Sequence, residues 1–325
     1  MKKKFYLTLD TETATLPFAN EICKDSKQKQ KIAIAKPLVY DIGWTITDRV
    51  GNIVKKENFL IQETFFVPNV FNTAYYCNKR PIYMDLLAHD KIKVATWNNV
   101  MDILLQDLRT VDFCCAYNAC FDFKKAIPFT ERYIENLYSV NYNNWEKEQK
   151  QKCKNLLTGS DCSENPNYLK PVFELRGEEF DVVDLWGVAC DRLINIEKYK
   201  KFCLENELVT ASVQFFKTSA ETSFQYLMNQ HDFIEDHTAL SDAEIESVIL
   251  TKALKKGKLV PQIESFPFRL LGTTFDYAIK RNNPKYLKTL LVLLEEYMKN
   301  LRPDTGYFSR ILNEYSRLEM AYDNM

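Results

Sequence analysis

Carboxylate side chains recur in three short segments of the chain, and the spacing of the first pair could support metal chemistry. Asp10 and Glu12 lie in the run Leu9-Asp10-Thr11-Glu12-Thr13, at the end of an apolar alternation. Residues two apart in a strand point to the same face, so these two carboxylates would share one side. Two carboxylates held so close repel each other, and Mg²⁺ or Mn²⁺ would relieve that repulsion. The alternative is a pair of solvated acids at a strand end.

A second acidic segment follows an apolar run in the middle of the chain. Residues 111–117, VDFCCAY, are apolar enough to form a buried strand, and Asn118 then opens a helix. Asn118 could cap that helix, which would place Asp122 near its first turn. There Asp122 either complements the helix dipole or supplies a third carboxylate. Phe121 beside it is either a core residue or a face on which a base stacks.

The third segment, residues 237–244, combines a histidine with acids. Ser241 and Glu244 have the spacing of a capping box, which predicts a helix that begins at Asp242. His237 would then lie on the preceding loop, free to reach across a cleft, while Asp242 stays in the first helical turn. The alternative for His237 is a structural histidine whose hydrogen bonds are satisfied inside the fold.

In this order, the three segments resemble the motifs of the DnaQ-like 3′→5′ exonucleases, in their DEDDh branch. The first motif, D-x-E-T after a strand, is matched by residues 10–13. The second, H-N-x-x-F-D, is matched from Asn118 to Asp122, although Tyr117 stands where the family often has histidine. The third, H-x-A-x-x-D-A, is matched in full by residues 237–243. Each motif alone is weak, but three in the right order and setting are specific.

The resemblance implies a hydrolase that releases nucleoside 5′-monophosphates from a 3′ end. It implies two divalent cations, Mg²⁺ or Mn²⁺, bound by four carboxylates: Asp10, Glu12, Asp122 and Asp242. It also implies that His237 accepts a proton from the attacking water and completes a catalytic set of five. Four further residues are expected to seat the terminal nucleotide: Thr13, Leu16, Asn118 and Phe121.

Apolar periodicity predicts the elements that position these segments. Alternation predicts strands over residues 5–10, 39–47 and 53–61, the last two joined by a turn. Residues 179–189 read as a buried strand that runs into a helix. Apolar residues at helical spacing predict helices over residues 98–109, 242–255 and 284–300. Asn98 or Asn99 is the expected N-cap of the first of these helices.

Leading strands followed by helices alternating with strands predict a mixed α/β fold. The resemblance, over roughly residues 1–256, implies a ribonuclease H-like fold: a five-stranded mixed sheet with three leading antiparallel strands, flanked by helices. We divide the chain into an exonuclease domain (1–258), which carries a polar insertion at about 141–179, and a helical C-terminal extension (259–325). We expect the extension to cover the core. The alternative is that its Leu-rich face docks a replication or repair partner.

Composition narrows the function classes. The net charge of −1 provides no overall positive field, which argues against a tight non-specific duplex binder but not against an enzyme that gathers acids around cations. Nine cysteines without a C-x-x-C pair argue against a zinc ribbon, and Cys114, Cys115 and Cys120 are expected in the core. The first apolar run is broken by Asp10 and Glu12, so neither a signal peptide nor a membrane span is expected. We expect a cytoplasmic protein.

The substrate and the role stay open at this point. A nucleic acid with a free 3′ end is implied, and single-stranded DNA is favoured because compact dimeric exoribonucleases of the same family lack a long insertion and a C-terminal extension. The alternative is an exoribonuclease with the same chemistry. A third hypothesis is a non-catalytic adaptor that retained the fold and binds a replication partner through its helical tail.

Overall fold

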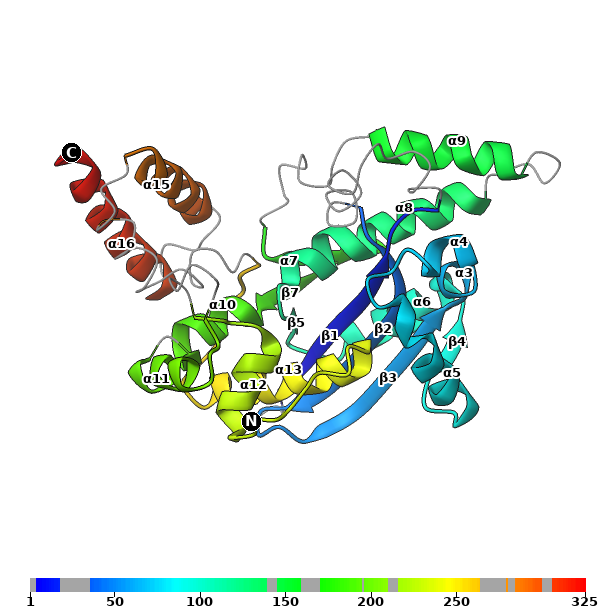
Figure 1. Cartoon of the computed structure of the whole chain (residues 1–325), viewed down its shortest axis with the longest axis horizontal. Coiled ribbons are helices and arrows are strands. Elements are labelled where there is room, and N and C mark those ends of the chain that lie inside the picture. Colours follow the sequence, from blue (N-terminus) through cyan, green and yellow to red (C-terminus); the bar gives the residue numbers. More distant parts are fainter. Residues whose placement is uncertain are drawn as a thin grey trace.

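A seven-stranded mixed sheet, in the order β4-β3-β2-β1-β5-β7-β6, forms the centre of the structure (Figure 1). The computed structural model describes these residues: 4–17, 36–138, 145–158, 170–194, 196–209, 216–263, 279, 284–299 and 306–325. Within them, no helix is long and apolar enough to cross a membrane. The predicted α/β class is confirmed.

Three antiparallel strands open the chain, as predicted: β1 (Phe5–Ala14), β2 (Leu38–Asp48) and β3 (Ile53–Ile61). The turn between β2 and β3 is held by the Asp48 carboxylate, which accepts the backbone N–H groups of Val50 and Asn52. Gly51 in this turn has a φ of +97°, which an L side chain rarely adopts.

β1 is longer than predicted, and this changes the setting of the first acidic pair. The strand was expected to end at Asp10, but it continues to Ala14, with a register shift between Glu12 and Thr13. Threonines at positions 11 and 13 suit an extended backbone because they branch at Cβ. Asp10 and Glu12 therefore lie inside a paired strand, which fixes their backbone more firmly than a strand end would.

The other half of the sheet is mostly parallel. β5 (Phe113–Ala116) runs parallel to β1, and β7 (Glu178–Asp184) runs parallel to β5. The edges are β4 (Lys93–Ala95), parallel to β3, and β6 (Val172–Leu175), antiparallel to β7.

The five-stranded expectation was therefore wrong by two edge strands. The proposed insertion at 141–179 contains β6 and the first residues of β7; residues 141–144 and 159–169 of it lie outside the described part. Short edge strands with exposed residues carry little apolar alternation, which is why the pattern did not indicate them.

Helices cover both faces of the sheet, and an apolar cluster marks each face. The first cluster includes Leu7 and Leu9 of β1, whereas the second includes Tyr6. Because successive strand residues point to opposite faces, Asp10 lies on the same side of β1 as Tyr6. The buried Cys114 and Cys120 belong to the first cluster and Cys115 to the second, as expected for core residues.

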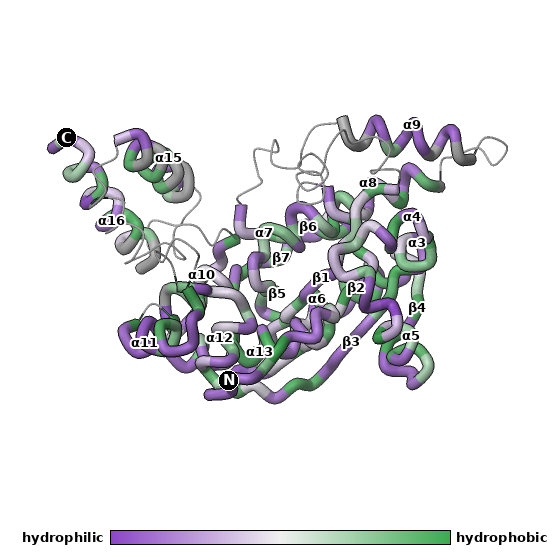
Figure 2. Tube along the Cα trace, viewed as in Figure 1, coloured by the Kyte–Doolittle hydropathy of each residue, from purple (hydrophilic) through white to green (hydrophobic). Residues whose placement is uncertain are grey.

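The helices that contribute to the first cluster are α3 (Gln62–Phe65), α4 (Pro68–Phe71), α5 (Arg80–Ala88), α6 (Trp97–Leu108), α7 (Ala119–Phe121), α8 (Ile127–Tyr138) and α9 (Trp145–Thr158). A 3₁₀ turn η1 (Cys77–Lys79) precedes α5, and a π-helical stretch η2 (Asp122–Ala126) joins α7 to α8. α9 is largely hydrophilic and lies beside α8 (Figure 2). α9 lies within the predicted insertion at 141–179 and contributes part of the polar composition on which that prediction was based.

The helices that contribute to the second cluster are α10 (Leu185–Ala189), α11 (Glu197–Glu205), α12 (Ala220–Met228), α13 (Ala239–Leu254), α15 (Pro284–Lys299) and α16 (Gly306–Asp323). A π-helical stretch η5 (Cys190–Ile194) follows α10. The predicted helix over 284–300 is confirmed as α15, which packs against α16. Leu287 and Leu294 of α15 and Leu318 of α16 are fully buried in the second cluster, so these apolar faces are at least partly covered by the chain itself.

The start of α6 shows how a distant residue can cap a helix. α6 begins at Trp97, with Thr96 as its N-cap, and not after Asn98 or Asn99 as predicted. The backbone N–H of Trp97 donates to the Glu63 carboxylate at 3.1–3.2 Å. Because Glu63 is 34 residues away, the local pattern could not indicate this cap.

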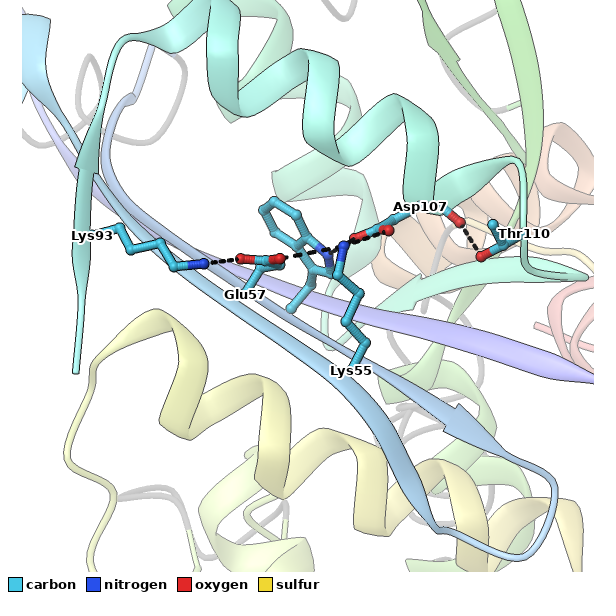
Figure 3. A network of polar contacts seen from close by, with 6 residues as sticks. Lys55, Glu57, Lys93, Asp107 and Thr110 are labelled. Carbon is cyan, nitrogen blue, oxygen red and sulfur yellow. Dashed lines mark hydrogen bonds and ion pairs between the residues drawn. The ribbon is translucent and has the colours of Figure 1, made fainter. Parts of the chain in front are cut away.

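One polar network ties α6 to the β3 edge of the sheet (Figure 3). Lys55 of β3 donates to both carboxylate oxygens of Asp107 at 2.7 and 2.8 Å, and it forms an ion pair with Glu57 at 3.2 Å. Glu57 also pairs with Lys93 of β4, and the Trp44 indole N–H donates to Asp107 at 2.8 Å. We call these four charged residues the paired network: Lys55, Glu57, Lys93 and Asp107. Each acid in it has a cationic partner.

Candidate metal centre

Asp10 and Glu12 lie on β1 opposite the middle of β2, where Asp10 pairs with Gly43 and Glu12 pairs with Asp41. Burial is the main cause that raises the pKa of Asp10 well above its ordinary value. Four neighbouring carboxyl groups raise it further: Glu246, Asp122, Asp242 and Glu12. The pKa of Glu12 is also raised well above its ordinary value, mainly by burial. The acids predicted from three separate segments therefore act on one another in the fold.

Gly43 allows α13 to lie directly on β2 at this point. A Cβ atom at position 43 would lie 2.4 Å from the backbone nitrogen of Leu240 and 2.6 Å from its Cα. Such contacts are far shorter than van der Waals distances, so any other residue would push the helix away. α13 packs against both β1 and β2. Because Gly43 has no side chain, α13, which carries Asp242, can lie against β2 and next to β1, which carries Asp10 and Glu12.

The start of α13 is held by a residue that the sequence analysis missed. The predicted capping box is not formed: the helix begins at Ala239 with Thr238 as N-cap and no side-chain cap bond. Instead, the Asp41 carboxylate accepts the Ala239 N–H at 2.9 Å and the Tyr83 hydroxyl at 3.0 Å. Its other oxygen is buried without a partner among the described residues. Burial, the largest cause, raises the pKa of Asp41 to about 7.

His237 lies on the loop before α13, as predicted. Its φ of +50° is unusual for a residue with a side chain. Its Nδ1 atom lies 3.7 Å from Asp242 Oδ2 and 3.7 Å from Glu235 Oε2, and the Tyr76 ring stacks on it at 4.4 Å between centroids. The adjacent Asp242 carboxylate is the main cause that raises the pKa of His237. Lys79 lies near enough to act against that rise.

One group of side chains in the described part of the chain has the geometry of a metal site. Glu12, His237 and Asp242 each offer a ligand atom, and these atoms all lie within 4.8 Å of one another. Asp242 is only 8 % exposed, and its Oδ1 atom is buried with no hydrogen-bond partner in that part of the chain. A carboxylate oxygen in that state is costly unless a donor or a cation meets it. The donor set of carboxylates and one imidazole therefore fits a divalent cation.

Asp122 is linked to this centre by a hydrogen bond from β1. Its Oδ1 atom accepts the Thr11 hydroxyl at 2.6 Å, and it is 2 % exposed. Burial, the largest cause, raises the pKa of Asp122 to about 7, although the bond from Thr11 acts in the opposite direction. Asp122 lies at the first position of η2 and not within a regular α-helix. The second predicted acid is thus bonded to the strand that carries the first two.

The four residues predicted to seat a nucleotide lie in different surroundings. Leu16 is fully buried and packs in the first apolar cluster, and a substrate role for it stays a prediction. Phe121 is partly buried and packs against the same cluster. Thr13 is half-buried on β1. A substrate role for Thr13 and Phe121 stays a prediction.

Asn118 does not cap the helix as predicted. Its backbone is left-handed, with a φ of 75°, and its side chain makes no cap bond. Asparagine tolerates this conformation better than most residues, which explains its place in the sharp turn between β5 and α7. Its N–H donates to the Asp184 carboxylate at 3.3 Å. Asn118 therefore shapes the turn that delivers Asp122, and a substrate role for it stays a prediction.

Glu246 of α13 is an acid of this centre that the motif analysis missed. It is 2 % exposed, and its carboxylate accepts the Tyr117 N–H at 3.0 Å. It follows Asp242 by four residues, so both side chains lie on one face of the helix. That spacing is readable in the sequence, but Glu246 belongs to none of the three motifs. We call the five residues Asp10, Glu12, Asp122, Asp242 and Glu246 the acid cluster.

Comparison of the chain with models of protein families, with curated proteins and with solved structures finds no match. The functional interpretation therefore depends on the three sequence segments and on the geometry that brings them together. That geometry is a cluster of buried and half-buried acids with one histidine beside Glu12 and Asp242.

Proposed function

We propose that the chain is a metal-dependent 3′→5′ exonuclease that releases nucleoside 5′-monophosphates from single-stranded DNA ends. The observation that carries this proposal is the convergence of Asp10, Glu12, Asp122, His237 and Asp242, which come from three distant segments, at one place beside β1. The resemblance of these segments to the DEDDh motifs supports it. The antiparallel order β3-β2-β1 followed by parallel β5 and β7 supports the further proposal of a ribonuclease H-like fold.

Two divalent cations, Mg²⁺ or Mn²⁺, would be held by Asp10, Glu12, Asp122 and Asp242. When bound, such cations stabilise the negative charge that develops on the oxygens of the phosphodiester. Two observations support the fit of these residues. Asp242 Oδ1 is buried without a partner in the described part of the chain, and neighbouring carboxyl groups raise the pKa values of Asp10 and Glu12. Both features are unfavourable in the protein alone and are relieved by cations.

His237 would accept the proton of the attacking water. Asp242 and Glu235 face its Nδ1 atom, and a carboxylate beside an imidazole both orients the ring and makes it more basic. The stacked Tyr76 ring restricts the imidazole from one side. A ring nitrogen of His237 lies within 4.8 Å of ligand atoms of Glu12 and Asp242, so the base and ligand roles of His237 need separate tests.

Thr13, Leu16, Asn118 and Phe121 would seat the terminal nucleotide. Lys79 places a positive charge near Glu12 and Asp242, where a phosphate would approach. The chain carries a net charge of −1, so binding would depend on such local contacts and not on a broad basic surface. DNA is proposed over RNA, and the experiment below separates the two.

The direct test is product analysis on matched strands of DNA and RNA with one sequence, each labelled at its 5′ end. With Mg²⁺ or Mn²⁺ we expect the DNA strand to shorten stepwise from its 3′ end and to release 5′-monophosphates, and we expect EDTA to stop the reaction. Faster digestion of the RNA strand would replace the proposal with the exoribonuclease alternative. Internal cleavage, 3′-monophosphate products or no digestion with either cation would contradict the proposed activity.

A further inference from the structure

Glu246 lies at the junction of all three acidic segments. It sits on α13 one turn beyond Asp242, on the face of the helix that packs against β1 and β2. Its carboxylate accepts the Tyr117 N–H at 3.0 Å, and Tyr117 directly precedes the turn that delivers Asp122. Of the neighbouring charges that raise the pKa of Asp10, Glu246 has the largest effect. It is therefore near the first, second and third segments at once.

The charge of Glu246 is not compensated in the described part of the chain. No lysine, arginine or histidine there forms an ion pair with it, and Asp122 and Asp242 act on it as like charges. It is 2 % exposed, so water does not screen it well. Leaving a carboxylate buried and unpaired costs several kcal/mol as an order of magnitude.

A purely structural role would not need that charge. The one hydrogen bond that Glu246 is seen to accept, from the Tyr117 N–H, could equally be accepted by the amide oxygen of a glutamine. A negative charge at this position is useful when a cation lies nearby. Asp242, on the same face of α13, carries the buried Oδ1 atom that lacks a partner in the described residues, and this is an independent sign that a ligand belongs here.

We propose that Glu246 is a fifth carboxylate of the divalent-cation centre, in addition to the four acids that the sequence motifs predict. Its two tasks are combined in one side chain: one oxygen holds the Tyr117 turn, and the negative charge strengthens cation binding beside Asp10. This inference rests on the proposed function only in so far as that function requires the centre to bind divalent cations.

The test is Mn²⁺ binding to the full chain, measured by calorimetry and by thermal melting in the absence of nucleic acid. Glu246→Gln keeps the size of the side chain and the acceptor for the Tyr117 N–H but removes the charge. We expect its Mn²⁺ affinity to fall about tenfold, which corresponds to ~1.4 kcal/mol. We expect its melting temperature without cations not to fall, since an unpaired buried charge has been removed.

Glu244→Gln is the matched control. Glu244 lies two residues away on the same helix, is partly exposed and pairs with Lys56, so its loss should leave Mn²⁺ affinity unchanged. Wild-type Mn²⁺ affinity in Glu246→Gln, or no Mn²⁺ binding by the parent chain, would overturn the inference. A lower melting temperature with unchanged affinity would show a structural role and would overturn it too. A tenfold loss in a chain that digests no nucleic acid would keep the inference and contradict only the exonuclease.

Discussion

The paired network and the acid cluster use the same kinds of side chain on the same sheet, with opposite charge balance. In the paired network, Lys55 and Lys93 meet Glu57 and Asp107 at hydrogen-bond or ion-pair distance. In the acid cluster, neighbouring carboxyl groups raise the pKa values of Asp10, Glu12 and Glu246, whereas Lys79 and His237 act on Asp242 in the opposite direction.

This difference in charge balance distinguishes ion pairs that stabilise the fold from a group of acids that could bind a cation. In this structure, acids that hold elements together meet cations or N–H and O–H donors, because burial of an unpaired charge is unfavourable. Acids gathered without partners destabilise the protein alone and gain when a ligand supplies positive charge. The largest expected effects on activity should therefore come from the acid cluster, and effects on stability alone should come from the paired network.

Asp10→Asn and Asp242→Asn should give the largest change. Each removes a carboxylate from the acid cluster, and we expect the rate of 3′-end digestion to fall on the order of 10³-fold. Their stability without cations should not fall, because a repelling charge is lost. The rate is measured on a labelled DNA strand and the stability by urea unfolding.

Asp102→Asn, which alters an exposed pair with Arg176, is the control. A variant of Asp10 or Asp242 as fast as the parent would remove it from the proposed centre.

His237→Ala should give the next largest change and should separate its two candidate roles. If His237 acts as the base, the rate should fall about 10²-fold while Mn²⁺ affinity stays the same. A parallel loss of Mn²⁺ affinity in calorimetry would instead identify it as a ligand, in agreement with its distance to Glu12 and Asp242. Tyr76→Phe keeps the stacked ring and should retain the parent rate.

Lys55→Met should break the paired network and change stability alone. Asp107 is 6 % exposed and would keep its bond from Trp44 but lose its cation. We expect the free energy of unfolding to fall by about 2 kcal/mol, since one charge of a partly buried pair is left behind. Urea unfolding measures the change, and the digestion rate should stay unaltered. Lys56→Met, which breaks an exposed pair with Glu244, should cost less than ~1 kcal/mol.

The smallest effect expected is a pH dependence of stability in EDTA. Burial raises the pKa values of Asp41, Asp122 and Glu235 to about 7, above the values near 4 of an unfolded chain. Between these values the folded state binds more protons, so stability is present at low pH and is lost as pH rises through about 7. We expect the melting temperature to fall by a few degrees between roughly pH 5 and pH 8. Mn²⁺ at the higher pH should reverse the fall. A melting temperature that rises over this range would contradict the raised pKa values of these three acids.

The apolar periodicity of the sequence predicted those strands and helices in which the periodicity is clear. The bounds of β3, Ile53–Ile61, match the prediction, and the helices predicted over 98–109 and 284–300 are α6 and α15 with ends shifted by one residue. The failures have a common cause. Glu63 caps α6 and Asp41 caps α13, and both are remote in sequence from the helix that they cap. A local capping pattern such as Ser241 with Glu244 cannot compete with a buried carboxylate delivered by the sheet.

The sequence by itself determined the alternation that builds β1, β2 and β3, and it determined which acids and which histidine could do chemistry. Tertiary structure decided which of them meet. Gly43 lets α13 lie on β2, Asp41 fixes the start of that helix, and Glu246 of the same helix bonds the strand end that precedes Asp122. Leu16, by contrast, is enclosed in the core. The physical reason is that backbone approach, burial and like-charge contact depend on residues far apart in the chain, whereas periodicity and motif spacing are local.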